Sequence, residues 1–395
     1  MRVSRKILEL FDLWLQDLHG MRRRAVTEAA LAVLRCGSVV SASVGRAIAT
    51  STTDKHGIKR VDRLLGNVKL QAELKRVYRR VAAHSLGTAT HPVVLVDWTQ
   101  VGKDKCVLKA VLALRGRGVP LYAEAHRLTA QARAGVHRRF LERLAAMLPV
   151  GCVPVLVTDA GFKQPWAKAV RAMGWDFVTR VRGRTCVRQN PQSPWFSAKD
   201  CAKHAKAGIA VDMPDAEINF HNTVRCRVLL WDGRSARARK RPTESGRRIR
   251  KRRAVSAAHE PWLLATSLAS EAANVVAVYA LRMQIEQSLR DDKTTLAWGW
   301  HLAKVGTRTC ARLNVQLLLT ALVTTIALLA GIAAEQANLA RRYQANTERR
   351  RRVLSLVALG RRVLATAQFD HQHLDSARRW LQAHLPQISW LYLRV

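Results

Sequence analysis

Residues 92 to 183 carry an alternation of strand and helix patterns that only a few folds can accommodate. Three apolar or β-branched runs come first, which predicts three consecutive strands in a meander: PVVLVDWTQV, CVLKAVLALRG and VPLYAEA. A helical stretch over 137–148 follows, then the strand pattern CVPVLVTDA, a helix opened by Pro165 and the strand pattern DFVTRVRG. With 48% apolar residues among 395, the chain can bury a large core around these elements.

Three antiparallel strands followed by helix, strand, helix and strand is the element order of a ribonuclease-H-like fold. We therefore expect an α/β core with a mixed five-stranded sheet and flanking helices. Asp97 is expected to end the first strand and Asp159 the fourth. In this order the two strands are neighbours, so we expect the acids to meet at one end of the sheet. A strand-end acid can also cap a helix or form a turn, and Asp159 stands before Ala160 and Gly161.

The rest of the chain predicts helical regions around this core and one β-rich interruption. The expected segments are a helical DNA-binding domain at 1–90, the core at 91–182 and 261–340, a β-rich basic insertion at 183–260, and a helical C-terminal region at 341–395. The first segment is basic and helical, which fits a DNA-reading module of helix-turn-helix type as well as it fits a plain helical bundle.

The charge of the chain indicates a polyanionic partner. Its 67 Lys and Arg against 28 Asp and Glu give a net charge of +39, with a pI of about 11.4. Nucleic acid accounts for this excess better than an anionic membrane does, because basic residues occur in nearly every segment. Eleven Lys or Arg lie in residues 234–253. We expect a solvated loop there that neutralises DNA phosphates when bound.

Residues 313–331 form an apolar stretch of 19 residues, long enough to cross a bilayer. Asn314, Gln316 and three threonines interrupt it and no second such stretch occurs, so we predict a helix buried behind the sheet, with a membrane protein as the alternative. Seven cysteines without a CxxC pair suggest neither a disulfide framework nor a structural zinc. A reducing cytoplasm fits these cysteines best. The N-terminus has no signal-peptide pattern.

The stretch YALRMQIEQSLRDDK, residues 279–293, has the 3.6-residue period of a helix. Steps of three, four and seven residues lead from Tyr279 to Arg282, Glu286 and Lys293, which places all four on one helical face. Taken alone, the pattern also describes a solvated helix with an Arg282–Glu286 ion pair. Together with the two strand-end aspartates, however, Glu286 completes a set of three carboxylates, which is what a two-metal phosphodiester site requires.

The same four residues match the signature Y-x2-R-x3-E-x6-K at every spacing. On this signature the chain resembles bacterial DDE transposases of the insertion-sequence-four group, to which the Tn-five and Tn-ten enzymes belong. The resemblance runs from about residue 25 to 340. It includes LVDWT around Asp97, VTDAGF around Asp159, the β-rich insertion, and PWLLATSL upstream of the signature.

This resemblance implies a cut-and-paste DNA transposase with a metal-binding triad. By resemblance, Asp97, Asp159 and Glu286 are the catalytic residues and hold two Mg²⁺ ions, for which Mn²⁺ can substitute. The implied partners are double-stranded DNA, as the terminal inverted repeats of the element and as target, and a second copy of the chain in a synaptic homodimer. The implied location is the bacterial cytoplasm, with association to the nucleoid when the protein is bound to DNA. A metal-dependent nuclease or resolvase of the same fold and a non-catalytic nucleic-acid-binding protein stay open as alternatives.

The resemblance also implies contacts to DNA outside the triad. Tyr279, Arg282 and Lys293 resemble the residues that grip the DNA backbone near the cut, where a guanidinium or an ammonium suits a phosphate. Trp262 stands where the family places an indole that stacks on a flipped base. A tryptophan at the start of a strand is also an ordinary core residue.

Overall fold

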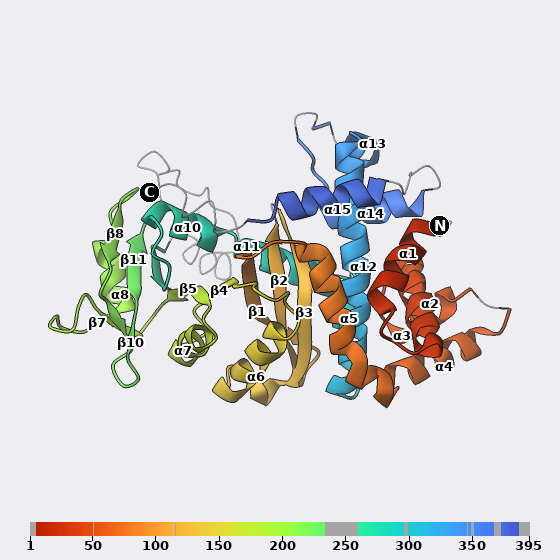
Figure 1. Ribbon diagram of the computed structural model, residues 1–395, viewed down its shortest axis with the longest axis horizontal. Helices are drawn as coiled ribbons and strands as arrows, with labels where there is room; N and C mark the ends of the chain where they lie inside the picture. Colours follow the sequence, from red (N-terminus) through yellow and green to blue (C-terminus); the bar gives the residue numbers. More distant parts are fainter. Residues whose placement is uncertain are drawn as a thin grey trace, which may run out of the picture. The chain divides into compact units, whose positions relative to one another are not determined.

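The computed structural model describes residues 5–49, 51–114, 116–233, 260–295, 299–345, 347–348, 351–366 and 373–386 (Figure 1). The contacts of the chain divide into two compact units. Unit 1 comprises Met1–Cys152 and Met283–Gln387, and unit 2 comprises Val153–Arg282 and Ile388–Val395. The predicted polybasic run at 234–253 lies outside the described residues. The five predicted segments do not coincide with the two units, and their boundaries stay a prediction.

The sheet of unit 1 is the predicted meander of three strands. β1 (Val93–Val101), β2 (Lys105–Leu114) and β3 (Arg117–Arg127) are joined in that order by antiparallel pairing. Their side chains are almost wholly buried along β2 and β3, because helices cover both faces. The three apolar runs of the sequence therefore fold as strands in the predicted order.

The position of Asp97 in its strand differs from the prediction. Asp97 is the fifth of nine residues in β1 and lies in the middle of the strand, whereas we expected it to end the strand. The strand continues beyond Asp97. Thr99 and Val101 are buried, and pairing with β2 extends to Val101 opposite Lys105. One half-exposed acid on the pleat therefore does not interrupt the ladder of backbone hydrogen bonds.

The described helices of unit 1 come from both of the segments that form this unit. They are α1 (Arg5–Leu15), α2 (Gly20–Cys36), α3 (Ser41–Ala47), α4 (Asp54–Leu65), α5 (Val68–Leu86), α6 (Ala134–Ala145), α11 (Met283–Lys293), α12 (Cys310–Gln336), α13 (Ala340–Tyr343), α14 (Leu356–Ala365) and α15 (His373–Ala383), with short 3₁₀ turns at Leu128–Ala130 and Leu302–Lys304. The N-terminal region is helical as predicted. Its role in reading DNA stays a prediction.

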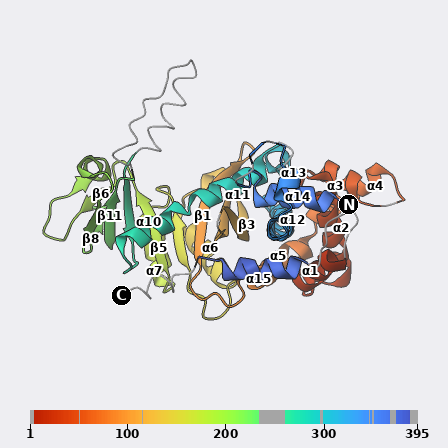
Figure 2. The ribbon, with the colours of Figure 1, turned by 90° about the horizontal axis from the view of Figure 1, so that it is seen from above.

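The long apolar helix α12 runs through the middle of unit 1 and packs against β3, α5, α14 and α15 (Figure 1). Figure 2 looks along α12 and shows α14 on one side of it and α5 on the other. Within the described residues it is the one helix long and apolar enough by composition to cross a membrane, and its most apolar window is completely buried. This agrees with the prediction of a helix buried behind the sheet.

The polar residues of α12 have partners inside unit 1. Asn314 Oδ1 accepts the N–H of Ala125 on the edge strand β3, and Gln316 Nε2 donates to the carbonyl of Val39. A buried amide group costs little free energy when it is hydrogen-bonded in this way. At the crossing with α14, a Cβ on Gly360 would lie 1.8 Å from the carbonyl oxygen of Ala327. Glycine therefore allows the two helix backbones to touch.

Unit 2 is built on a five-stranded mixed sheet. Its strand order is β4 (Val155–Thr158), β5 (Asp176–Val181), β12 (Trp262–Thr266), β11 (Arg227–Trp231) and β8 (Ala210–Met213). β4 and β5 are parallel, and the other neighbours are antiparallel. The helices α7 (Gln164–Ala172), which carries Pro165 in its first turn, and α10 (Ala272–Ala280) pack against β5. The predicted order of helix, strand, helix and strand after the meander is confirmed.

The predicted β-rich insertion contributes to this sheet as well as forming a small sheet of its own. β8 and β11 extend the sheet beyond β12. The small sheet has the order β10 (Val224–Arg225), β9 (Glu217–Ile218), β6 (Cys186–Arg188) and β7 (Phe196–Ser197), next to the short α8 (Ala198–Cys201) and a 3₁₀ turn at Ala202–His204. The α/β class with a mixed sheet is thus confirmed in its coarse form.

The prediction of one continuous helix over 279–293 is wrong. Tyr279 lies in the last turn of α10, Arg282 lies in the turn that follows, and Glu286 belongs to α11. At the break, the N–H groups of Leu281 and Arg282 donate to carbonyls three residues back, Val278 at 3.2 Å and Tyr279 at 3.0 Å. These tighter bonds end the 3.6-residue ladder. The signature residues are therefore divided between unit 2 and unit 1.

Candidate active site

Asp97 lies on the face of the unit 1 sheet that α11 covers. Residues paired directly across an antiparallel ladder share a face, and Asp97 is paired with Lys109. Lys109 Nζ donates to Ser288 Oγ of α11 at 2.9 Å, which identifies this face as the one under α11. Asp97 Oδ1 accepts the N–H of Trp98 at 2.7 Å, and this bond orients the half-buried carboxylate.

Buried ion pairs anchor α11 to the sheet. Lys109 Nζ lies 2.5 Å from Asp292 Oδ2, and the two residues are only 4% and 2% exposed. Arg117 Nε at the start of β3 lies 2.8 Å from Asp291 Oδ2. Burial raises the pKa of the Asp291 carboxyl even though the charge of Arg117 lowers it. The interface under α11 is therefore strongly desolvated, and its charges are paired.

Glu286 and Lys293 line one hollow of ≈ 580 Å³ together with Thr99 of β1. Glu286 is half-buried in the first turn of α11, and Lys293 lies seven residues further along the same helix face. Lys293 Nζ donates to Thr99 Oγ1 at 2.6 Å. Since Thr99 stands two residues after Asp97, the two side chains leave β1 on the same face. In unit 1, therefore, the face of β1 that carries Asp97 lies against the helix that carries Glu286 and Lys293.

The opposite face of β1 is held by a buried polar network. Trp98 Nε1 donates to His137 Nε2 on α6 at 3.0 Å, and burial lowers the pKa of His137 to about 4, so its imidazole is neutral and can accept this bond. Nearby, Arg143 and His126 both contact the buried carboxylate of Glu124. Burial acts to raise the pKa of Glu124, but these hydrogen bonds bring it below its usual value. The strand that carries Asp97 is thus fixed from behind.

Asp159 follows the last residue of β4 in unit 2, as predicted from the sequence. Its Oδ1 accepts the N–H of Gly161 at 2.9 Å, and Thr179 Oγ1 of β5 donates to its carbonyl oxygen at 3.2 Å. The turn-forming role that we considered is therefore present, and it is compatible with a functional one. As in Asp97, a backbone N–H holds one oxygen of a half-buried carboxylate.

Tyr279, Arg282 and Asp159 are electrostatic neighbours within unit 2. Tyr279 is 3% exposed, and this burial raises the pKa of its phenol. Arg282, through its charge and a side-chain hydrogen bond, and Arg180 act to lower that pKa, whereas Asp159 acts to raise it. Such opposing effects require charges close to the phenol. Unit 2 therefore gathers two signature residues beside one predicted metal ligand.

Trp262 starts β12 and is half-buried among aromatic residues of unit 2. Its ring centroid lies 4.9 Å from that of Tyr279, edge to face, and 5.1 Å from that of Trp231 on the neighbouring strand. These contacts are those of an ordinary packed tryptophan. Stacking of Trp262 on a DNA base stays a prediction.

The donor set fits Mg²⁺ in its chemistry, because Mg²⁺ prefers hard oxygen ligands and keeps part of its shell as water. Asp97 and Glu286 belong to unit 1, and Asp159 belongs to unit 2. All three carboxylates are partly exposed. Throughout the parts of the chain that the structure describes, no group of three or more His, Cys, Asp or Glu side chains is arranged to hold a metal.

The sequence did not lead us to the buried polar residues on the face of α11 that packs against the sheet. Gln284, Ser288 and Asp292 recur every four residues and are all buried, and Gln284 Oε1 accepts the N–H of Leu114 at 2.8 Å. The available signal was Lys109, a single charge inside the apolar run of β2. A lysine in such a run needs a buried anionic partner, and the recurring polar residues on α11 were the candidates.

Comparison with known proteins adds a family to this geometry. A family model described as the transposase DDE domain matches residues 88–326, which is more than half of the chain. The matched range contains all seven predicted site residues, from Asp97 to Lys293. A comparison with curated proteins gives no match.

Proposed function

The chain belongs to the transposase DDE-domain family, and we propose that it is a cut-and-paste DNA transposase that cleaves at insertion-sequence ends and joins them to target DNA. The family match supports transposition of DNA as the class of function. The narrower assignment to the insertion-sequence-four group is part of the proposal. It is supported by the spacing of Tyr279, Arg282, Glu286 and Lys293 along the chain.

Asp97, Asp159 and Glu286 are the residues that we propose to hold Mg²⁺. When bound, the ions would activate the nucleophile and stabilise the departing oxygen of an in-line displacement at phosphorus. The chain's own contribution is to orient the carboxylates. Backbone N–H groups fix Asp97 and Asp159, and the buried contacts of α11 fix the rotation of Glu286 about the helix axis.

Lys293 and Arg282 are proposed to bind the DNA backbone. An ammonium group acts on a phosphate as a point charge, and a guanidinium can bind it through two parallel hydrogen bonds. Arg282 acts on Tyr279 through its charge and a side-chain hydrogen bond, and the ring of Trp262 packs against that of Tyr279. The net charge of +39 supports a long DNA footprint, and synapsis of two ends implies a homodimer on DNA.

One observation carries the proposal. Within the range that the family model matches, α11 packs on the Asp97 face of β1 and carries Glu286 and Lys293 into one hollow with Thr99. A purely structural helix would not need to place a carboxylate and an ammonium in a hollow at the strand that carries Asp97. A site for phosphate chemistry needs both.

Glu286→Gln tests this function, with Glu142→Gln as the matched control. Glu142 is an exposed carboxylate on α6 of the same unit. The substrate is linear DNA that carries the gene with its flanking sequence, in which the proposed function places the terminal inverted repeats. We expect Glu286→Gln to abolish Mg²⁺-dependent cleavage and strand joining while binding in EDTA persists, and the control to act like the wild type.

Two outcomes contradict the proposal. Normal cleavage by Glu286→Gln would remove Glu286 from the site and the triad with it. Cleavage by the wild type without any joining of the ends to target DNA would instead favour the nuclease or resolvase alternative.

A further inference from the structure

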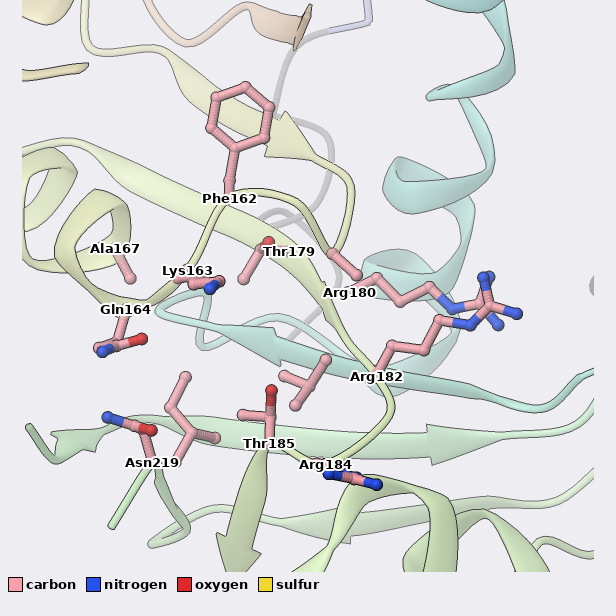
Figure 3. A pocket seen from close by; sticks show the side chains of 13 residues that line it. Phe162, Lys163, Gln164, Ala167, Thr179, Arg180, Arg182, Arg184, Thr185 and Asn219 are labelled. Carbon is pink, nitrogen blue, oxygen red and sulfur yellow. The ribbon is translucent and has the colours of Figure 1, made fainter. Parts of the chain in front are cut away.

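Beside Asp159, unit 2 contains a basic hollow of ≈ 290 Å³ (Figure 3). It lies between the loop after β4, the end of β5 with the turn that follows, and β9 of the small sheet. Four cationic side chains line it, namely Lys163, Arg180, Arg182 and Arg184, and no carboxylate is among the lining residues. A hollow of this composition suits an anion and repels a metal cation.

Two of the four cations are available for a ligand. Lys163 and Arg184 are exposed, and neither has an ion-pair partner in the described part of the chain. Arg180 and Arg182 share a single carboxylate, with Arg182 Nη2 at 2.6 Å and Arg180 Nη2 at 3.2 Å from Glu260 Oε2. Two guanidinium groups held beside one carboxylate keep a net positive charge.

Neutral donors face the same space. Figure 3 shows the side chains of Gln164, Thr185 and Asn219 around the hollow and the guanidinium groups of Arg180 and Arg182 side by side. The Nε atom of Arg180 is buried and has no hydrogen-bond partner. A buried N–H donor without an acceptor, next to a cluster of cations, indicates that this region has more hydrogen-bond donors than the protein itself satisfies.

The hollow adjoins the candidate active site. Thr179, one of its lining residues, donates to the backbone carbonyl of Asp159, and Ala160 and Phe162 of the loop after Asp159 line its wall. A ligand there lies beside a proposed metal ligand and on the same unit. The site nevertheless uses none of the predicted DNA-binding residues, which are Tyr279, Arg282, Lys293 and Trp262.

We propose that this hollow binds a backbone phosphate of the DNA substrate, next to but outside the catalytic site. The proposal rests on DNA being the substrate of the proposed function. Lys163 and Arg184 neutralise the phosphate charge, while the amide and hydroxyl groups donate hydrogen bonds to its oxygens. Such a contact positions the strand relative to Asp159 without reading its sequence.

The test is the salt dependence of DNA binding by the double variant Lys163→Gln/Arg184→Gln. A fluorescein-labelled duplex of mixed sequence is titrated in EDTA with the full-length protein, and binding is followed by fluorescence anisotropy. Each lost phosphate contact lowers the slope of log K against log salt by about one. Because both side chains bind the same phosphate, we expect a loss of about one and an affinity weaker on the order of ten-fold at low salt.

The matched control is Lys199→Gln/Lys206→Gln, which removes the same charge from exposed positions of unit 2 outside the hollow. We expect its slope to stay at the wild-type value, and Lys163→Arg/Arg184→Lys, which keeps both charges, to retain most of the affinity. Equal losses in the two double variants would overturn the proposal, because the charges would then act only through the overall field. No loss in either would overturn it as well, because Lys163 and Arg184 would then not contact the DNA.

The two proposals fail separately in these experiments. Because EDTA prevents metal-dependent cleavage, the slope reports DNA binding without catalysis. If the double variant loses slope but the wild type never cleaves at the inverted repeats, the transposase function is refuted and the hollow remains a DNA contact. If the wild type transposes normally and the double variant keeps the wild-type slope, the hollow is refuted and the transposase function remains.

Discussion

The substitution Lys109→Met should strongly destabilise unit 1. Methionine matches lysine in length and is apolar, so it removes the charge without leaving a large cavity. In the wild type, Asp292 Oδ2 has Lys109 Nζ at 2.5 Å, and Asp292 Oδ1 has no hydrogen-bond partner. The variant therefore leaves a carboxylate that is 2% exposed without any side-chain donor.

Breaking a buried pair by removing one partner costs about 3–5 kcal/mol in the free energy of unfolding. Removing both charges should cost far less, so Lys109→Met/Asp292→Leu should recover most of the loss.

Urea unfolding measures the loss of stability in the single and in the double variant. Hydrogen exchange of the β2 and α11 amides localises the effect to unit 1. The control is Lys105→Met on the same strand, where the partner Asp104 is 70% exposed at its side chain, so solvent screens the pair and its loss should matter little. If Lys109→Met is no more harmful than Lys105→Met, or if the double variant is as unstable as the single one, the buried pair does not anchor α11.

Two further predictions concern residues around Asp97. Lys293→Met should lower DNA affinity and flatten its salt dependence, while Thr99→Val, which removes only the 2.6 Å hydrogen bond, should leave both nearly unchanged; anisotropy titrations separate them, and equal effects would make Lys293 a structural residue. Burial lowers the pKa of His137 from 6.5 to about 4, so the folded state binds fewer protons than the unfolded state between these pH values. The resulting contribution to stability is present above pH 6.5 and lost toward pH 4. His137→Gln should therefore lose less stability over that window in acid titrations followed by circular dichroism, and an unchanged pH profile would contradict this.

The order of strands and helices from β1 to β5 could be predicted because its signal is local. Runs of β-branched and apolar residues, glycines at the turns and Pro165 in the first turn of α7 all act over a few neighbouring residues. The burial of α12 could be predicted for a related reason, since Asn314 and Gln316 made a lipid-facing helix unfavourable.

The break between α10 and α11 could not be predicted in the same way. Leu281 and Arg282 are good helix formers, and neither glycine nor proline marks the position. The break is formed by two backbone hydrogen bonds to carbonyls three residues back, and the residues on its two sides pack in different units. Tertiary packing therefore decided the local structure against helix propensity.

The buried polar face of α11 explains why a helix beside the candidate active site is not held by leucines. An α-helix turns 100° per residue, so a shift of one residue would carry Glu286 away from the hollow that it shares with Thr99. Apolar side chains pack in several registers with little difference in free energy, whereas Gln284, Ser288 and Asp292 each have one partner on β2. We infer that these buried contacts are kept for the orientation of Glu286 rather than for stability. On this reasoning Lys109→Met/Asp292→Leu folds nearly as well as the wild type and still cleaves DNA more slowly.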